Sequence, residues 1–324
     1  MIIFLIVVAL LCVGAFLFTR WQVGRIEALY PPRGRFIEVD GLRLHYTEAQ
    51  PQGDVRAHVV LLHGASGNQA DVMGPLGSRL AAQGFHVFAF DRPGHGWSER
   101  TRQAQQASPA RQVALIRAAL EKLNVERAIV AGHSLAGALA ANFAIQHKSF
   151  TQGLVLIAPV THPWPGGVTW YYEWAARPWI GRIFAHLLAM PVGLAMMDKA
   201  VAGVFSPQTP PPDYIERIGA PLVLRPDNFI ANAQDVACLA GFIAQQSPRM
   251  HEIEAPTTII TGDHDKVVYA YLHALGSAHE VKGAHLVTLQ GVGHAVQNIA
   301  PTDVIDAIID VAARADARAA RMIP

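Results

Sequence analysis

The sequence predicts an α/β fold: a mostly parallel, doubly wound sheet with a helical insertion, preceded by an N-terminal transmembrane helix. Three observations predict it. Short apolar runs without polar alternation, typical of strands covered on both faces, alternate with helix-forming segments. This alternation of strand-like and helix-like segments stops from Pro159 to about Ile253 and then resumes. The first 19 residues, Met1 to Thr19, carry no charge.

The N-terminal run is long enough to cross a bilayer. Ile2 to Phe18 consists almost entirely of Ile, Leu, Val, Phe and Ala. At ~1.5 Å per residue such a helix covers roughly 26 Å, close to the ~30 Å of hydrocarbon, and Trp21 suits an interfacial anchor. The alternative is a cleaved signal peptide, but no basic residue precedes the run and no small-x-small cleavage pattern follows it. Residues 1–20 are therefore expected to be a single membrane anchor.

Basic residues follow the anchor at Arg20, Arg25, Arg33 and Arg35. Because positive charge favours the cytoplasmic side of a span, we expect the globular part of the chain in the cytoplasm. Residues 21–34, which end in two prolines, an arginine and a glycine, are predicted to be a linker.

The first part of the globular fold is expected over residues 35–158. Arg35 to Val39 and Leu42 to Thr47 alternate around Asp40-Gly41, a two-residue hairpin turn. Buried strands and helices then alternate, which predicts right-handed crossovers. The strands are expected at His58–Leu62, His86–Phe90, Arg127–Ala131 and Gly153–Ala158, and the helices at Ala70–Gln83, Arg111–Leu123 and Ala138–His147.

Residues 159–253 are predicted to form a helical cap, with helix-like runs at Ile183–Val192 and Ala231–Gln245. Its aromatic residues can line a substrate-pocket lid, rest on the bilayer, or pack the cap onto the sheet, which is expected of at least half of them. They are Trp164, Trp170, Tyr171, Tyr172, Trp174 and Trp179. The fold resumes over 254–324, with strands at Pro256–Thr261 and His285–Leu289 and helices around Tyr269–Leu275 and over Asp303–Arg314.

Composition excludes several classes of protein. With 51% hydrophobic and 16% charged residues, the chain can bury a sizeable core. A formal charge of +1 gives no electrostatic basis for binding nucleic acid. Cys12 and Cys238 are the only cysteines, so neither a disulfide framework nor a zinc cluster can be assembled from cysteine.

Ser134 lies where a serine becomes an exposed nucleophile. It follows an apolar strand and precedes a helix-forming run, and a sharp turn of this kind needs small residues on either side. Gly132 stands two positions before it and Ala136 two positions after it. The motif usually written G-x-S-x-G thus has alanine as its fifth residue, with Gly137 one step later.

Two later residues complete a nucleophilic triad. His294 follows the last strand in a glycine-rich turn, and Asp265 lies just beyond the preceding strand. Loops at the same edge of a parallel sheet can bring both to Ser134, and Ser, Asp, His is the chain order associated with this architecture. Asp263 competes with Asp265 for the acid position, and Asp265 is preferred.

Backbone N–H groups are expected to bind the developing oxyanion. One belongs to Leu135, directly after the serine, and the other to Ala65, in the loop after an early strand. Gly64 and Gly67 allow the backbone to approach closely there.

Other polar residues are expected to be structural. Asp91 is predicted to cap or pair with neighbouring loop groups. The histidines fall into two sets: His63, His95 and His133 as loop or structural groups, and His264 and His285 as exposed or paired ones.

These residues together resemble the α/β-hydrolase-fold serine hydrolases, from about Gly34 to the C-terminal helix. The resemblance rests on the His63-Gly64 loop, the segment from Asp91 to Gly96, the Ser134 turn, Gly262-x-x-Asp265 and Gly293-His294. Within that superfamily the chain is similar to the capped group of esterases, lipases, carbon–carbon bond hydrolases, haloperoxidase-like enzymes, epoxide hydrolases and haloalkane dehalogenases. The last two use an aspartate nucleophile, against which Ser134 argues. The resemblance implies no metal and no organic cofactor.

The expected function is cleavage of an ester or related acyl bond of a small apolar or acyl substrate. The alternative reactions are carbon–carbon bond hydrolysis or haloperoxidase-like chemistry on the same triad. A third hypothesis is a membrane-tethered accessory protein without turnover, because membership of a fold does not guarantee activity.

Overall fold

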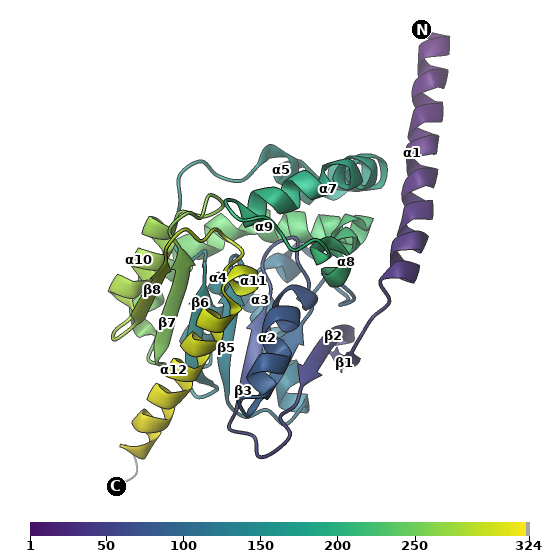
Figure 1. The fold of residues 1–324 in the computed structure, drawn as a ribbon. Helices are drawn as coiled ribbons and strands as arrows, with labels where there is room; N and C mark the ends of the chain where they lie inside the picture. The colour runs from purple at the N-terminus through teal and green to yellow at the C-terminus, as the bar shows by residue number, and fades with distance from the viewer. Residues whose placement is uncertain (322–324) are drawn as a thin grey trace.

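The structure, a computed structural model, describes residues 1–321 and is built around one eight-stranded sheet (Figure 1). The strand order is β1-β2-β4-β3-β5-β6-β7-β8; β1 pairs antiparallel with β2 and β2 with β4, and the other pairs are parallel. The strands are β1 (Arg35–Val39), β2 (Leu42–Ala49), β3 (Ala57–Leu62), β4 (Phe85–Phe90), β5 (Ala128–His133), β6 (Thr151–Ile157), β7 (Thr257–Gly262) and β8 (His285–Leu289). The predicted α/β class and mostly parallel sheet are confirmed.

Helices cover both faces of the sheet, so the central strands are apolar on both sides. Within β3, Val60 and Leu62 point into one hydrophobic cluster while Val59 and Leu61 point into the other. The first cluster is closed by α3 (Pro109–Lys122), α4 (Ala136–Gln146) and α10 (Ala270–Glu280). The second is closed by α2 (Ala70–Ala81) and α12 (Pro301–Ala320), with the short α11 (Val296–Ile299) beside them.

The predicted β1–β2 hairpin is present. Asp40 has φ 51° and Gly41 has φ 72°, the left-handed conformation that a two-residue hairpin turn requires at both positions. This hairpin adds the antiparallel edge to an otherwise parallel sheet.

The predicted helical insertion lies between β6 and β7, and we call these helices the helical cap. They cover the sheet at one end of its strands, at the top of Figure 1. The cap contains α5 (Trp170–Ala176), α6 (Pro178–Phe184), η2 (Ala185–Ala189), α7 (Met190–Phe205), α8 (Tyr214–Ile218), η3 (Ala220–Leu224), α9 (Pro226–Gln246) and η4 (Ser247–Glu252). A further short helix, η1 (Ala104–Ala107), precedes α3.

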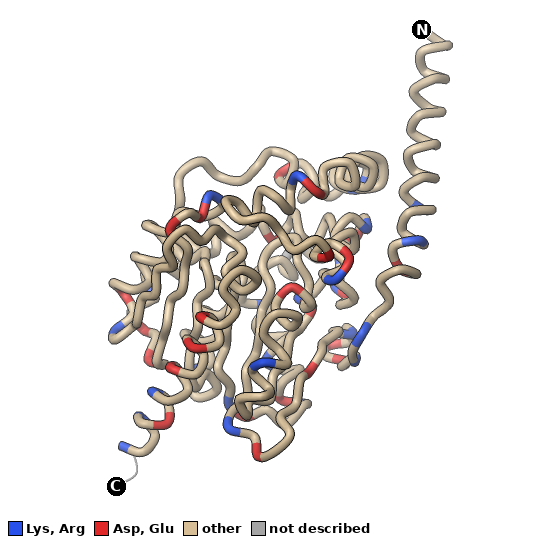
Figure 2. The backbone as a smooth tube through the Cα atoms, viewed as in Figure 1, with Lys and Arg blue, Asp and Glu red and all other residues tan. Residues whose placement is uncertain are grey.

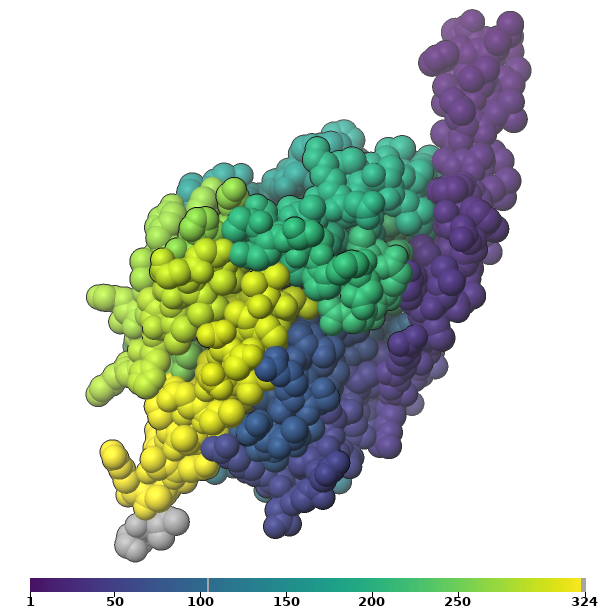
Figure 3. All heavy atoms as spheres, in the orientation of Figure 1, coloured from purple at the N-terminus to yellow at the C-terminus, as the bar shows by residue number. Residues whose placement is uncertain are grey.

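The N-terminal helix α1 (Ile2–Leu29) is longer than the apolar run that predicts it. Its first half stands clear of the globular part and carries no charged residue (Figures 2 and 3). Its second half packs on the cap, where Ile26 joins Met190 and Leu222 in a hydrophobic cluster. Helical backbone therefore covers most of the expected 21–34 linker, because this packing extends the helix. Tyr30 to Gly34 connects α1 to β1.

Element boundaries differ from the expected ones mainly at the C-terminus. The final helix was expected over Asp303–Arg314, and α12 runs from Pro301 to Ala320. Ala315, one turn after the buried Val311, is buried within this added length. Packing against the sheet therefore carries the helix beyond the segment with the strongest apolar pattern.

Candidate active site

Ser134 occupies a strained turn between β5 and α4. Its φ is 55°, a left-handed conformation that a residue with a side chain rarely adopts. A Cβ on Gly132 would collide with the backbone oxygen of Ala136, and a Cβ on Gly137 would collide with Pro159. The two glycines near the serine are thus required by backbone contacts on opposite sides of the turn, and Ala136 fits as the first residue of α4.

Backbone hydrogen bonds hold the strained serine in place. The Ser134 N–H donates to the Ile157 carbonyl at 2.9 Å, and the Ser134 carbonyl accepts from Gly137 at 2.8 Å and from Val160 at 3.0 Å. These partners lie at the ends of β6 and α4. The turn is therefore fixed by the sheet and the following helix.

The structure brings Ser134, His294 and Asp265 together, as the sequence predicts. Ser134 Oγ lies 2.9 Å from His294 Nε2, and His294 Nδ1 lies 2.7 Å from Asp265 Oδ2. An ionised carboxylate only accepts, so Nδ1 carries the proton and Nε2 is free to accept from the serine hydroxyl. The side chains of His294 and Asp265 are 4% and 0% exposed, so these contacts are shielded from water.

Asp265, the acid that contacts His294, is held in its charged form. Burial would raise the pKa of Asp265, but the hydrogen bond from His294, together with its charge and the backbone N–H groups of Val268 and Val267, lowers the pKa below its usual value. Asp263, the competing acid, lies at the surface and instead contacts His264 Nδ1 and the Gly291 N–H. The geometry supports Asp265 over Asp263.

The predicted oxyanion donors lie beside the serine. Gly64 approaches so closely that a Cβ on it would stand 3.0 Å from Ser134 Cβ. Neither the Ala65 N–H nor the Leu135 N–H makes a backbone hydrogen bond within residues 1–321. Backbone N–H groups that are not used by carbonyl partners can stabilise charge that develops on a substrate oxygen.

A polar cluster behind His294 was not predicted as a unit. His133 Nε2 donates to the His294 carbonyl at 3.1 Å, and Gln297 contacts His133 Nδ1 at 3.3 Å and donates to Asp71 at 3.0 Å. Asp71 also accepts from Tyr214 of the cap at 2.8 Å. Burial, and then the charge of His294, lowers the pKa of His133 to about 4, so this imidazole is neutral near pH 7. Asp71 gave no sequence signal, because an acid in the first turn of a helix is ordinarily a surface residue.

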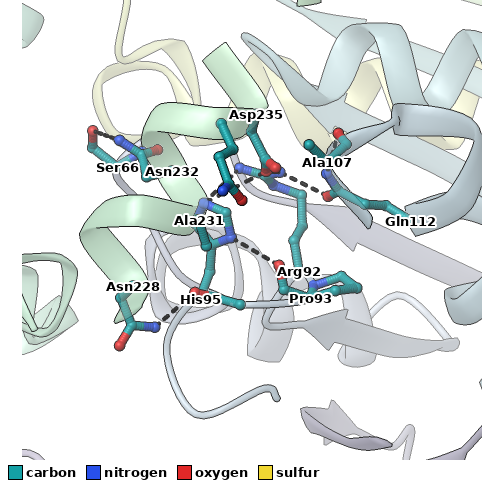
Figure 4. A network of polar contacts seen from close by, with 12 residues as sticks. Ser66, Arg92, Pro93, His95, Ala107, Gln112, Asn228, Ala231, Asn232 and Asp235 are labelled. Carbon is teal, nitrogen blue, oxygen red and sulfur yellow. Dashed lines mark hydrogen bonds and ion pairs between the residues drawn. The ribbon is translucent and has the colours of Figure 1, made fainter. Parts of the chain in front are cut away.

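A second buried network ties the cap to the loop that carries Ala65 (Figure 4). Arg92 donates to the carbonyls of His63 at 3.0 Å and Gly64 at 3.1 Å, and to Asp235 of α9 at 2.5 Å. Arg100 donates to the other oxygen of Asp235 at 2.5 Å. The loop is thus fixed by Arg92, which is in turn held by Asp235, a cap residue that the sequence did not single out.

The remaining polar residues occupy the structural positions expected of them. Asp91 accepts from the N–H groups of Gln69 and Trp97, both at 2.8 Å, and contacts His45. His63 and His95 are fully buried, and burial, followed by the charge of Arg92, lowers the pKa of each well below its usual value. The more exposed histidines, His264 and His285, contact Asp263 and Asp310 respectively.

The aromatic residues of the cap divide into two sets. Trp164, Tyr171 and Tyr172 are half-buried, whereas Trp170, Trp174 and Trp179 are exposed. Trp164 packs on the core beside His273 of α10, whereas Trp170, Trp174 and Trp179 face outward.

A large cavity of the cap lies away from Ser134, which is not among its lining residues. It has a volume of about 820 Å³ and opens between α6, α9 and the loop after β4, where arginines dominate its polar lining. Arg43, Arg100, Arg102, Arg182 and Arg225 line it, with Glu99 and Asp227. Among residues 1–321, no group of three or more His, Cys, Asp or Glu side chains is placed to hold a metal ion.

Comparison with known proteins agrees with the fold. The family model described as the alpha/beta hydrolase fold matches residues 57–300. A 2-hydroxy-6-oxo-6-phenylhexa-2,4-dienoate hydrolase of Burkholderia cepacia is 25% identical over 270 residues, which cover 80% of this chain and 87% of the relative. The crystal structure of an enol-lactonase from Burkholderia xenovorans LB400 has a TM-score of 0.66 at 21% identity and covers 86% of this chain and 99% of its own. Epoxide hydrolase A from Mycobacterium thermoresistibile gives a TM-score of 0.67 at 22% identity, with 86% and 98% covered.

Proposed function

Since the chain belongs to the alpha/beta hydrolase fold family, we propose that it is a serine hydrolase that cleaves a carboxylic ester or a related acyl bond through an acyl-enzyme. The observation that carries the proposal is the continuous path from Ser134 Oγ through His294 to Asp265, with contacts of 2.9 and 2.7 Å. A serine alcohol is a weak nucleophile at neutral pH, and a base within hydrogen-bond reach is what activates it.

In the proposed reaction Ser134 Oγ attacks the carbonyl carbon while His294 Nε2 takes the hydroxyl proton. The N–H groups of Ala65 and Leu135 donate to the oxyanion, and the resulting imidazolium gives its proton to the leaving alcohol. Water then attacks the acyl-enzyme, with His294 again acting as base, and releases the acid. Asp265 holds the Nδ1–H tautomer of His294 throughout.

A fluorophosphonate probe tests the nucleophile directly, because it forms a covalent bond with an activated serine. We expect the full-length protein to be labelled and Ser134→Ala to abolish labelling. Ser78→Ala, a change at an exposed serine of α2, is the matched control and should label like the parent. Strong labelling of the Ser134→Ala variant would contradict the assignment, and no labelling of the parent would favour the accessory-protein hypothesis.

Carbon–carbon bond hydrolysis on the same triad is the second candidate. The similarity to the 2-hydroxy-6-oxo-6-phenylhexa-2,4-dienoate hydrolase of Burkholderia cepacia favours it. A panel of p-nitrophenyl esters of increasing chain length separates the two reactions. Turnover of any ester supports acyl-bond cleavage, and inactivity against the whole panel by a protein that reacts with the probe supports the second candidate.

We also propose that α1 is a single membrane anchor with the hydrolase domain in the cytoplasm, residues 159–253 forming the cap over the site. The most apolar window of α1 has a mean hydropathy of 3.0 and is 6% buried, so almost none of its surface is used by the globular part. A signal sequence has the same composition, but Phe16, inside the apolar run, contacts His186 of the cap, and removal of the run would lose that contact.

A further inference from the structure

We propose that one face of the helical cap, on α6, η2 and α7, docks on the bilayer surface beside α1 as a second membrane contact. The proposal rests on the membrane anchor proposed for α1. It concerns which side of the domain meets lipid, which the anchor alone does not determine.

The cap carries a set of exposed apolar side chains on α6, η2 and α7, which we call the cap platform. Its members are Trp179, Ile183, Leu188, Val192 and Met196, at 81%, 63%, 49%, 56% and 45% exposure. Trp179 and Ile183 lie four residues apart on α6, as do Val192 and Met196 on α7, so each pair lies along one side of its helix. Leu188 comes four residues before Val192, in η2. Soluble domains rarely expose large contiguous apolar surfaces unless those surfaces bind something.

The opposite side of the same helices is packed against the domain. Met190 is fully buried in a cluster with Ile26 and Leu222, and a Cβ on Gly193 would collide with Leu224. The segment Pro178–Phe205 is long and apolar enough to span a bilayer, yet one of its sides is already covered by the rest of the cap and by α1. A helix held on one side and apolar on the other lies in the membrane interface and does not cross it.

The position of α1 sets how deep the cap platform lies relative to the bilayer. The Phe16 ring lies 5.8 Å from the His186 ring of η2, so the cap meets α1 within one turn of the end of its apolar run. With Ile2 to Phe18 in the hydrocarbon, η2 lies at the boundary between hydrocarbon and headgroups. Figures 1 and 3 show the cap at the end of the globular part from which α1 projects.

Charge on this surface is mixed. The exposed residues Arg182 and Lys199 lie near the platform, and Asp198 offsets one of these two charges. Apolar contact therefore carries the docking, and anionic lipid is not required for it. The occupant is the bilayer itself, since the platform continues the apolar surface of α1 at the same level.

Spin-label accessibility measures this contact on the full-length protein in phosphatidylcholine nanodiscs. In a background lacking Cys12 and Cys238, Leu188→Cys and Val192→Cys place labels on the platform. Leu275→Cys is the matched control, because Leu275 is 51% exposed on α10, away from the cap. Ile6→Cys reports on the anchor. The readout is the ratio of collisions with oxygen to collisions with a water-soluble nickel chelate, which rises in lipid.

We expect labels at positions 188 and 192 to show lipid-like ratios and the label at 275 to show a water-like ratio, with no change when anionic lipid is added. Water-like ratios at 188 and 192 with a lipid-like ratio at 6 would overturn the docking and leave the anchor intact. Water-like ratios at all three positions would overturn both. Spin–spin broadening at 188 that disappears on dilution with unlabelled protein would show a second copy on the platform and would also overturn the proposal.

Discussion

Ser134 illustrates how much surrounding structure one residue needs. A non-glycine residue at φ 55° costs on the order of 1–3 kcal/mol and persists only where its surroundings over-determine it. Here the N–H and the carbonyl of Ser134 are both bonded, to β6, the start of α4 and Val160. The strain exposes Oγ toward His294, which is the orientation that the proposed chemistry needs.

The two acids of the loop after β7 give a matched pair of variants. We expect Asp265→Asn to lower kcat on the order of 10⁴-fold, because an amide can donate to Nδ1 and so favours the tautomer whose Nε2 cannot accept the serine proton. Asp263→Asn should leave kcat close to that of the parent, because Asp263 contacts His264 and the Gly291 N–H at the surface. Ester turnover by both purified variants checks this, and an equal loss in both would remove Asp265 from the proposed triad.

The positions of the proposed triad could be predicted because each follows a strand end in the chain. Ser134, Asp265 and His294 combine a residue type with a place in the strand–helix order, and parallel sheets bring such places to one edge. Asp71 and Asp235 could not be predicted, because both lie within helices whose sequences look amphipathic. Their partners, Gln297 and Arg92, come from segments remote in the chain.

At the scale of elements, α9 is locked to the core by one carboxylate. Asp235 bonds Arg92 and Arg100, and the side chains of the three are 1%, 0% and 3% exposed. We expect Asp235→Asn to cost about 3–5 kcal/mol, since it leaves two buried guanidinium groups without their counter-charge. Urea unfolding followed by circular dichroism measures the loss.

Asp227→Asn is the control on the same helix. Asp227 is exposed in the first turn of α9, where its carboxylate interacts chiefly with the helix dipole, so its removal should cost about 1 kcal/mol or less. A comparable loss in both variants would mean that helix charge, and not the buried ion pair, holds α9 in place.

Strands were predicted more accurately than cap helices. β1 and β8 have the expected bounds and the other strands differ by one or two residues at an end, because each strand is a short apolar or alternating run with clear limits. In the cap, the run Ile183–Val192 spreads over α6, η2 and α7. Its apolar residues face both the domain and the outside, so periodicity alone does not mark where one helix ends.

For the whole molecule, buried neutral histidines set the response to acid. Burial is the largest cause that lowers the pKa of His133 and of His273, each to about 4, and it lowers the pKa of His63 and His95 as well. The unfolded chain binds protons at these sites near the ordinary value of 6.5, so below that pH it holds more protons than the folded protein. Stability should therefore be fully present above about pH 6.5 and fall as the pH drops toward 4, by up to about 1.4 kcal/mol per pH unit for each histidine.

Denaturant midpoints at pH 7.5, 6 and 5 measure this loss. His273→Gln should make the pH dependence shallower, and His285→Gln, at an exposed histidine, should leave it unchanged. A midpoint that stays constant or rises as the solution is acidified would refute the expectation.

The connection from Tyr30 to Gly34 has a consequence for how the molecule meets its substrate. A fully extended residue spans at most ~3.6 Å, so these five residues form a linker of at most about 18 Å between α1 and the first strand. With α1 inserted as proposed, the domain cannot diffuse away from the bilayer or turn its opposite side toward it. Its encounters with substrate are then confined to a thin layer along the lipid. Amphiphiles that partition into that layer are presented at a high effective concentration, whereas solutes in bulk water gain nothing from the tethering.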